Sequence, residues 1–117
     1  MPIGWHVLSY AEWDILGASL GDVVVAGDKL KETGTTHWLS PNTGATNESG
    51  FTALPGGLRQ DNGIFAEIGS SSVWWSSTEY NTIYALSRRA DNNYENFGKV
   101  VGGYNKKFGF SIRCVKD

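Results

Sequence analysis

The chain has 117 residues, with 15 glycines, five each of Trp, Tyr and Phe, and a formal net charge of −2. This length suits one hydrophobic core, whereas two cores of about 60 residues each would be marginal, so we expect a single domain over residues 1–117. The aromatic content excludes a disordered chain. The absence of surplus basic residues argues against a nucleic-acid partner. No apolar run approaches the roughly 20 residues that span a bilayer.

The first predicted element is a helix over residues 10–20. Ser9 and Glu12 have the spacing of a capping box, in which each side chain bonds the backbone amide of the other residue. Gly21 follows as the residue that ends the helix in a left-handed conformation. A second helix is predicted over residues 23–32, with Asp22 as its N-terminal cap.

Short apolar segments separated by turn-forming residues follow from Thr33 onward, which is typical of strands and loops. We predict strands over residues 72–76, 83–88, 94–101 and 108–115, and a hairpin turn at residues 61–63. Alternation in the last strand should bury Phe108, Phe110, Ile112 and Cys114. The predicted class is α+β, with the helices first and a small antiparallel sheet after them.

Six blocks of sequence resemble the Fibrobacter succinogenes major paralogous domain of Bacteroidetes and Fibrobacteres. The blocks are residues 4–7 (Gly-Trp-His-Val), 11–13, 27–38, 40–57, 74–79 (Trp-Trp-Ser-Ser-Thr-Glu) and 105–115. The resemblance implies a fold related to C-type lectins and formylglycine-generating enzymes, with two helices packed on a small twisted antiparallel sheet and long ordered loops. It also implies an extracellular or cell-surface location, with this domain as the C-terminal part of a longer surface protein. It implies no particular activity.

The resemblance bears on the single cysteine, Cys114. Similar proteins usually have a cysteine where Met1 stands here, and the resemblance implies that the two would form a disulfide, since the first and last strands of lectin-like folds lie side by side. In this chain we therefore expect Cys114 to be a buried free thiol. Relatives that generate formylglycine use a cysteine pair, which one cysteine cannot reproduce.

Enzymatic and metal chemistry find little support in the sequence. No Gly-x-Ser-x-Gly nucleophile motif occurs, and His6 and His37 lack the spacing of a helical metal site. At residues 40–42 the chain has Ser-Pro-Asn, and serine lacks the carboxylate that a calcium-dependent lectin site needs. We expect no cofactor, with calcium bound through carbonyls and residues such as Asn47, Glu48 or Asp91 as the weaker alternative.

A binding surface is the remaining candidate, because tyrosine with asparagine and serine is the chemistry of antibody loops. The predicted ligand-binding residues are Trp75, Tyr80, Tyr84, Arg88, Asn92, Asn93, Tyr94 and Tyr104. Trp74 and Trp75 should point to opposite sides of a strand, one into the core. The leading hypothesis is a non-enzymatic extracellular binding or adhesion module for a protein or glycan. The alternatives are a structural spacer of a repetitive or fimbria-like protein, a variable protein of a diversity-generating retroelement, and a degenerate relative of the formylglycine-generating enzymes.

Overall fold

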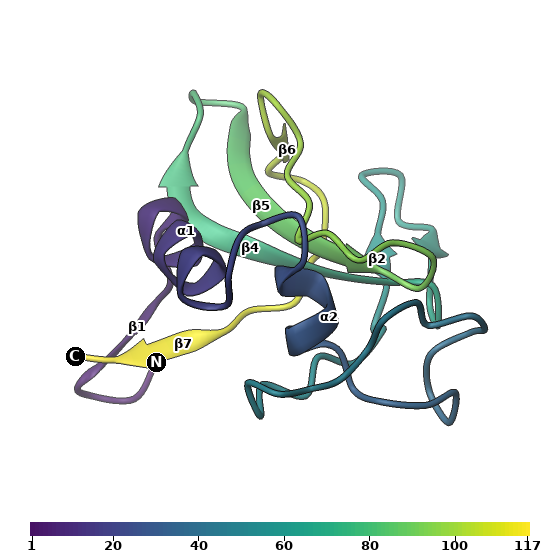
Figure 1. Cartoon of the computed structure of the whole chain (residues 1–117). Helices are drawn as coiled ribbons and strands as arrows, with labels where there is room; N and C mark the ends of the chain where they lie inside the picture. The colour runs from purple at the N-terminus through teal and green to yellow at the C-terminus, as the bar shows by residue number, and fades with distance from the viewer.

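Short helices and strands, joined by long loops, make up the α+β domain seen in a computed structural model that describes residues 1–117 (Figure 1). The elements are β1 (Trp5–Val7), α1 (Tyr10–Ser19), α2 (Ala26–Leu30), β2 (Leu58–Arg59), β3 (Phe65–Ala66), β4 (Ser71–Glu79), β5 (Tyr84–Asp91), β6 (Tyr104–Asn105) and β7 (Cys114–Lys116). Instead of the one predicted sheet there are three antiparallel ones, with strand orders β1-β7, β2-β3 and β4-β5-β6. Of 61 backbone hydrogen bonds, 41 lie outside the helices and strands, so the loops are ordered by their own hydrogen bonds.

Helix α1 confirms the prediction for residues 10–20 to within one residue. The hydroxyl of Ser9 accepts a hydrogen bond from the amide of Glu12 (3.2 Å), and the Glu12 carboxylate accepts one from the amide of Ser9 (2.8 Å). Gly21 has a φ of +115°, a conformation that glycine adopts without strain. Local signals therefore set both ends of this helix.

Helix α2 is shorter than predicted, at residues 26–30 instead of 23–32. The residues before it form a turn in which the amides of Val25 and Ala26 both donate to the carbonyl of Asp22. At the other end Lys31 is extended, with φ −69° and ψ 140°, and pairs with Ala53. A tertiary contact with a distant loop therefore ends the helix.

The core lies between α1 and the inner face of the β4-β5-β6 sheet. Trp13, Trp74 and Phe97 are almost completely buried there, and their ring centroids lie 5.6 to 6.2 Å apart. Trp75 is only partly buried, on the opposite face of β4. This confirms that the two neighbouring tryptophans point to opposite sides, with one of them in the core.

Two of the predicted strands differ in the structure. Residues 94–101 form a loop that makes a single bridge, between Gly98 and Arg89. The segment 108–115 does not form one strand, because Gly109 pairs with Arg59, Ser111 pairs with Trp74, and only Cys114–Lys116 forms β7. Since these parts have different neighbours, alternation along the segment does not define one buried face. Ile112 is 52% exposed.

Cys114 is exposed, which corrects the prediction that its thiol is buried. β7 pairs only with the short strand β1, so no second layer covers this position. The thiol lies 3.6 Å from the thioether sulfur of Met1. Met1 therefore lies beside Cys114, while the disulfide that the resemblance implies between these two positions stays a prediction.

We expect the Cys114 thiol to react rapidly and completely with an aromatic disulfide reagent in native buffer, because reactivity needs an accessible sulfur. The rate in native buffer should be within about tenfold of the rate in denaturant, which is measured by absorbance on the same sample. Protection by several orders of magnitude in native buffer would show that the thiol is buried.

Lys31 is a buried cation that joins the loop at Thr43 to the end of β5 and the loop after it. Its ammonium group donates hydrogen bonds to the carbonyls of Thr43 (2.8 Å), Asp91 (3.0 Å) and Tyr94 (2.9 Å), and the residue has no exposed surface. Burial lowers the pKa of Lys31, and the nearby carboxylates of Asp28, Asp91 and Glu95 oppose this effect. All three hydrogens of the ammonium group thus have acceptors, as a buried charge requires.

The variant Lys31→Met should lose about 3 kcal/mol or more of unfolding free energy, because three carbonyls lose their donor. Urea unfolding followed by tryptophan fluorescence measures the loss, and Lys99→Met, at an exposed position, is the matched control. A loss no larger than that of Lys99→Met would contradict a structural role for Lys31.

His6 connects β1, the start of α1 and the chain end. Its two ring nitrogens lie 2.6 Å from the Asp117 carboxylate and 2.7 Å from the Glu12 carboxylate. The hydrogen bond with Asp117, followed by the one with Glu12, raises the pKa of His6 above its usual 6.5. The hydrogen bond from the Ser9 amide, followed by the one with His6, lowers the pKa of Glu12 below its usual 4.5.

This arrangement should make stability depend on pH. A raised His6 pKa contributes stability that is complete below pH 6.5 and is lost as the pH rises through the folded value, whereas the Glu12 contribution is lost as the pH falls below 4.5. The difference in melting temperature between the wild type and His6→Gln should therefore be largest between these two values. Asp117→Asn should remove part of the same pH dependence. If the difference in melting temperature between the wild type and His6→Gln stays constant from pH 5 to pH 9, His6 does not contribute to stability in this way.

Candidate functional site

The predicted ligand-binding residues do not form one face. β5 has eight residues and is therefore about 24 Å long, with Tyr84 at its start and Asn92 just after its end. Tyr80 is exposed in the connection between β4 and β5, near Tyr84. At the far end Asn93 and Tyr94 are exposed, whereas the side-chain amide nitrogen of Asn92 donates to the carbonyl of Ser40 (3.1 Å).

Arg88 was predicted on the binding surface, and the structure corrects this. It is opposite Trp74 in the sheet, so both side chains point into the core, and Arg88 is only 1% exposed. Its guanidinium carbon lies 4.7 Å from the ring centroid of Tyr10 and 5.2 Å from that of Phe97, and it forms an ion pair with Asp14. Arg88 therefore joins β5 to α1 and is not accessible to a ligand.

The outer face of the β4-β5-β6 sheet brings two predicted residues together. The ring centroid of Phe110 lies 4.3 Å from that of Trp75 and 5.0 Å from that of Tyr104. Phe108 packs against Tyr104, with 5.4 Å between the centroids. We call these four partly buried residues, Trp75, Tyr104, Phe108 and Phe110, the aromatic face. The sheet separates them from the core.

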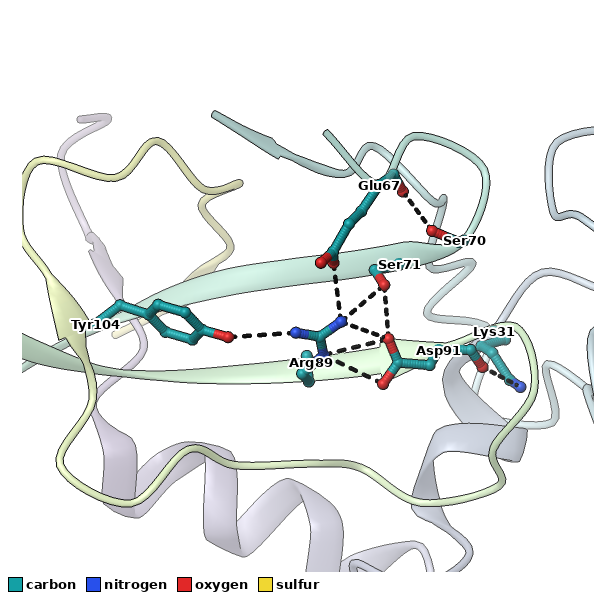
Figure 2. A network of polar contacts seen from close by, with 7 residues as sticks. All are labelled: Lys31, Glu67, Ser70, Ser71, Arg89, Asp91 and Tyr104. Carbon is teal, nitrogen blue, oxygen red and sulfur yellow. Dashed lines mark hydrogen bonds and ion pairs between the residues drawn. The ribbon is translucent and has the colours of Figure 1, made fainter. Parts of the chain in front are cut away.

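Arg89, next to the buried Arg88, lies on this outer side and is the centre of a polar network. Figure 2 shows its guanidinium between Glu67, Ser71, Asp91 and Tyr104. One terminal nitrogen donates to Glu67 and Ser71, both at 2.9 Å, and to Asp91 at 2.7 Å. The other donates to the Tyr104 hydroxyl at 3.3 Å. Figure 2 also shows Lys31 donating to the backbone carbonyl of Asp91.

The charge of Arg89 is therefore already compensated within the chain. Burial alone would lower the pKa of Arg89, but the hydrogen bonds and charge of Asp91, together with Glu67, outweigh burial and raise it. Its side chain is 22% exposed. Arg89 positions Tyr104 and fixes the edge of the aromatic face, with little capacity left for a ligand.

A groove beside the aromatic face has a charged side chain without a partner. This groove, of about 280 Å³, lies between the β2-β3 hairpin and the segment 109–111; we call it the hairpin groove, and it is lined by Gly56, Gly57, Leu58, Arg59, Phe65, Gly109, Phe110 and Ser111. Arg59 and Phe65 are directly opposite in the hairpin, and Phe65 is 79% exposed. The Arg59 side chain makes no hydrogen bond or ion pair within the chain.

Glycines let the two walls of the hairpin groove approach each other. A Cβ atom on Gly109 would lie 3.1 Å from the Cβ of Arg59, and one on Gly57 would lie 2.3 Å from the carbonyl oxygen of Ala66. Any other residue at Gly57 would therefore clash with the backbone of the hairpin. Phe110 lines the groove and belongs to the aromatic face, so the two features are continuous.

Arg59, Phe65 and Arg89 are not among the predicted site residues, and Phe108 and Phe110 were predicted to be buried. A signal for the first pair was present, because the correctly predicted turn at residues 61–63 places residues 59 and 65 opposite each other. Which of the neighbours Arg88 and Arg89 faces outward depends on the register of β5 with β4, and the sequence does not provide this register.

A larger pocket, of about 480 Å³, lies between α1 and β7. Its charged residues already have partners: Glu12 bonds Ser9 and His6, and Arg113 donates to the carbonyl of Phe51 and stacks on its ring. We therefore consider the hairpin groove the better candidate for a polar ligand.

Two of the side chains considered for metal binding or catalysis, those of His37 and Asn47, have partners within the chain. His37 contacts the Glu32 carboxylate at 2.9 Å. The amide group of Asn47 bonds both the amide and the hydroxyl of Thr52. No group of three or more His, Cys, Asp and Glu side chains is arranged to hold a metal ion. Neither helix has the length and apolar character needed to cross a membrane.

Comparison with known proteins gives one match. No curated protein and no solved structure is significantly similar to this chain. The family model of the Fibrobacter succinogenes major domain matches residues 1–116, which is nearly the whole sequence. The matched residues include all four members of the aromatic face. The chain therefore belongs to the Fibrobacter succinogenes major domain family.

Proposed function

We propose that this domain is a non-enzymatic binding module that recognises a glycan or protein through the aromatic face and the hairpin groove. The observation that carries the proposal is the continuity of the two features on the outside of a sheet whose other face covers the core. Sites for small ligands combine apolar and aromatic walls with a few polar groups that fix orientation, and Phe65, Phe110 and Arg59 provide this combination.

Exposure of the aromatic side chains supports recognition over a purely structural role. A second small core would cover its members, yet Phe65 is mostly exposed and the four residues of the aromatic face are only partly buried. Contiguous exposed apolar surface is a common mark of interaction sites. The rigid outer sheet would present these rings with little loss of conformational entropy on binding.

The proposal includes a C-type-lectin-like fold and an extracellular location in a bacterial surface protein. Its support is the antiparallel pairing of the first strand, β1, with the last, β7, and the long ordered loops between them. The same pairing places the two chain ends side by side in Figure 1, and the Asp117 amide donates to the Gly4 carbonyl (2.8 Å).

Chain-end geometry also bears on the alternative of a structural spacer. Spacer domains in a rod are joined end to end, so the chain enters at one pole and leaves at the other. Here any flanking chain would enter and leave at the same pole, beside β1 and β7. A domain attached in this way projects from its neighbours, which favours presentation of a binding surface.

An array of glycans and surface proteins tests the proposal, with Phe65→Ala as the site variant. We expect binding of at least one ligand, and loss of about tenfold or more of that affinity in Phe65→Ala, because a large exposed aromatic anchor is removed. Ile68→Ala is the matched control, since Ile68 is similarly exposed but lines a different pocket.

Two outcomes would contradict the proposed function. One is an array without binding at high protein concentration. The other is a ligand bound equally well by the wild type and by Phe65→Ala.

A further inference from the structure

The polar groups of the hairpin groove specify a class of ligand. Beyond the uncompensated Arg59, two other residues that line the groove have hydrogen-bonding groups without a partner in the chain. Neither the amide nor the carbonyl of Phe110 has a partner in the chain, and the hydroxyl of Ser111 also has none. A ligand that uses all of these groups combines an anionic group, several hydrogen-bonding groups and an apolar surface.

The apolar surface is next to the cation. Because Arg59 and Phe65 are cross-strand partners in the β2-β3 hairpin, their side chains start on the same face with Cβ atoms about 5 Å apart. Phe110 lines the groove as well. The Arg59 side chain runs past Gly109, and its guanidinium lies near Gly63 in the hairpin turn. A ring that stacks on Phe65 therefore needs a substituent directed toward this turn to reach the guanidinium.

An extended peptide does not suit this arrangement. A peptide that adds to a sheet edge needs several successive free amides and carbonyls. On either side of Phe110 they are already paired, Gly109 with Arg59 and Ser111 with Val73 and Trp75. Only one residue is open, which matches a compact ligand better than a strand. The groove volume of about 280 Å³ is just below the range of about 300 to 1,000 Å³ that is typical of ligand sites, which also favours a small ligand.

We propose that the hairpin groove binds a uronic-acid unit of an acidic polysaccharide, an inference that rests on the proposed function. The C–H face of the sugar ring packs on Phe65 and Phe110, and its carboxylate pairs with Arg59. The planar guanidinium matches a carboxylate with two parallel hydrogen bonds. The sugar hydroxyls bond the amide and carbonyl of Phe110 and the hydroxyl of Ser111.

The charge of the sugar can be removed without changing its ring, which makes the test sharp. Calorimetry with oligogalacturonate and alginate oligosaccharides is compared with the methyl esters of the same oligosaccharides. We expect the acids to bind about tenfold or more tightly than their esters. A hydrogen bond to a charged group is stronger than one between neutral groups, and a tenfold difference in affinity corresponds to about 1.4 kcal/mol. The affinity for the acids should fall as salt is added.

Variants at one position separate charge from packing. Arg59→Gln should reduce the affinity for the acids to that for the esters, and Arg59→Lys should retain a preference for the acids. Since Arg59 is exposed and its side chain makes no internal hydrogen bond, these variants should fold. Lys99→Gln removes an exposed cation outside the groove and should bind as the wild type does.

The possible failures are distinguishable. Equal affinity for acids and esters would overturn the uronic-acid assignment, and so would equal affinity of the wild type and Arg59→Gln for the acids. If Phe65→Ala still abolished binding, the proposed function would remain intact. Absence of binding to every acidic oligosaccharide would also overturn the assignment, as would tighter binding of a peptide with a free C-terminal carboxylate. The proposed function itself fails only if the broader array also gives no ligand that depends on Phe65.

Discussion

The ammonium group of Lys31 is the interaction on which the arrangement of the loops depends. It is bonded to the carbonyl of Thr43 in the loop after the short helix α2, to that of Asp91 at the end of β5, and to that of Tyr94 in the next loop. It therefore joins two regions of the chain that are far apart in sequence. Helices and strands here are too short to position these loops alone, and most backbone hydrogen bonds lie outside them. One cation with three directed donors replaces the regular hydrogen-bond ladder that a larger sheet would provide.

The register between β4 and β5 then decides which side chains are structural and which are available. Trp74 and Arg88 share the inner face with the core, whereas Trp75 and Arg89 share the outer face with Tyr104. Two arginines that are neighbours in sequence therefore have different roles: one is buried against α1, and the other organises the surface network in Figure 2. The donors of Arg89 in this network are bonded to acceptors within the chain. The charge of Arg59, at the adjacent groove, has no such partner.

Features set by neighbouring residues could be predicted from the sequence, and features set by pairing could not. The capping box of α1, its glycine stop, the hairpin turn before β3 and the position of β4 depend on a few consecutive residues. The length of α2, by contrast, is limited by the bridge between Lys31 and Ala53. The burial of Arg88 and the exposure of Cys114 depend on which strand lies opposite, as does the split of segment 108–115. For the same reason only Trp75 and Tyr104 of the predicted site meet on the aromatic face.

The pairing of β1 with β7 also determines how the domain responds to mechanical load. Trp5 is opposite Lys116 and Val7 is opposite Cys114, so the two chain ends leave from the same end of a three-residue antiparallel ladder. A force that pulls the ends apart acts across this ladder and opens its hydrogen bonds one after another, beginning with the pair nearest the ends. Strands pulled along their axes in opposite directions would break all their hydrogen bonds together. Under tension the terminal strands would therefore separate at low force, while the core around Trp13 and the groove between β2 and β3 remain unloaded until β1 and β7 have parted.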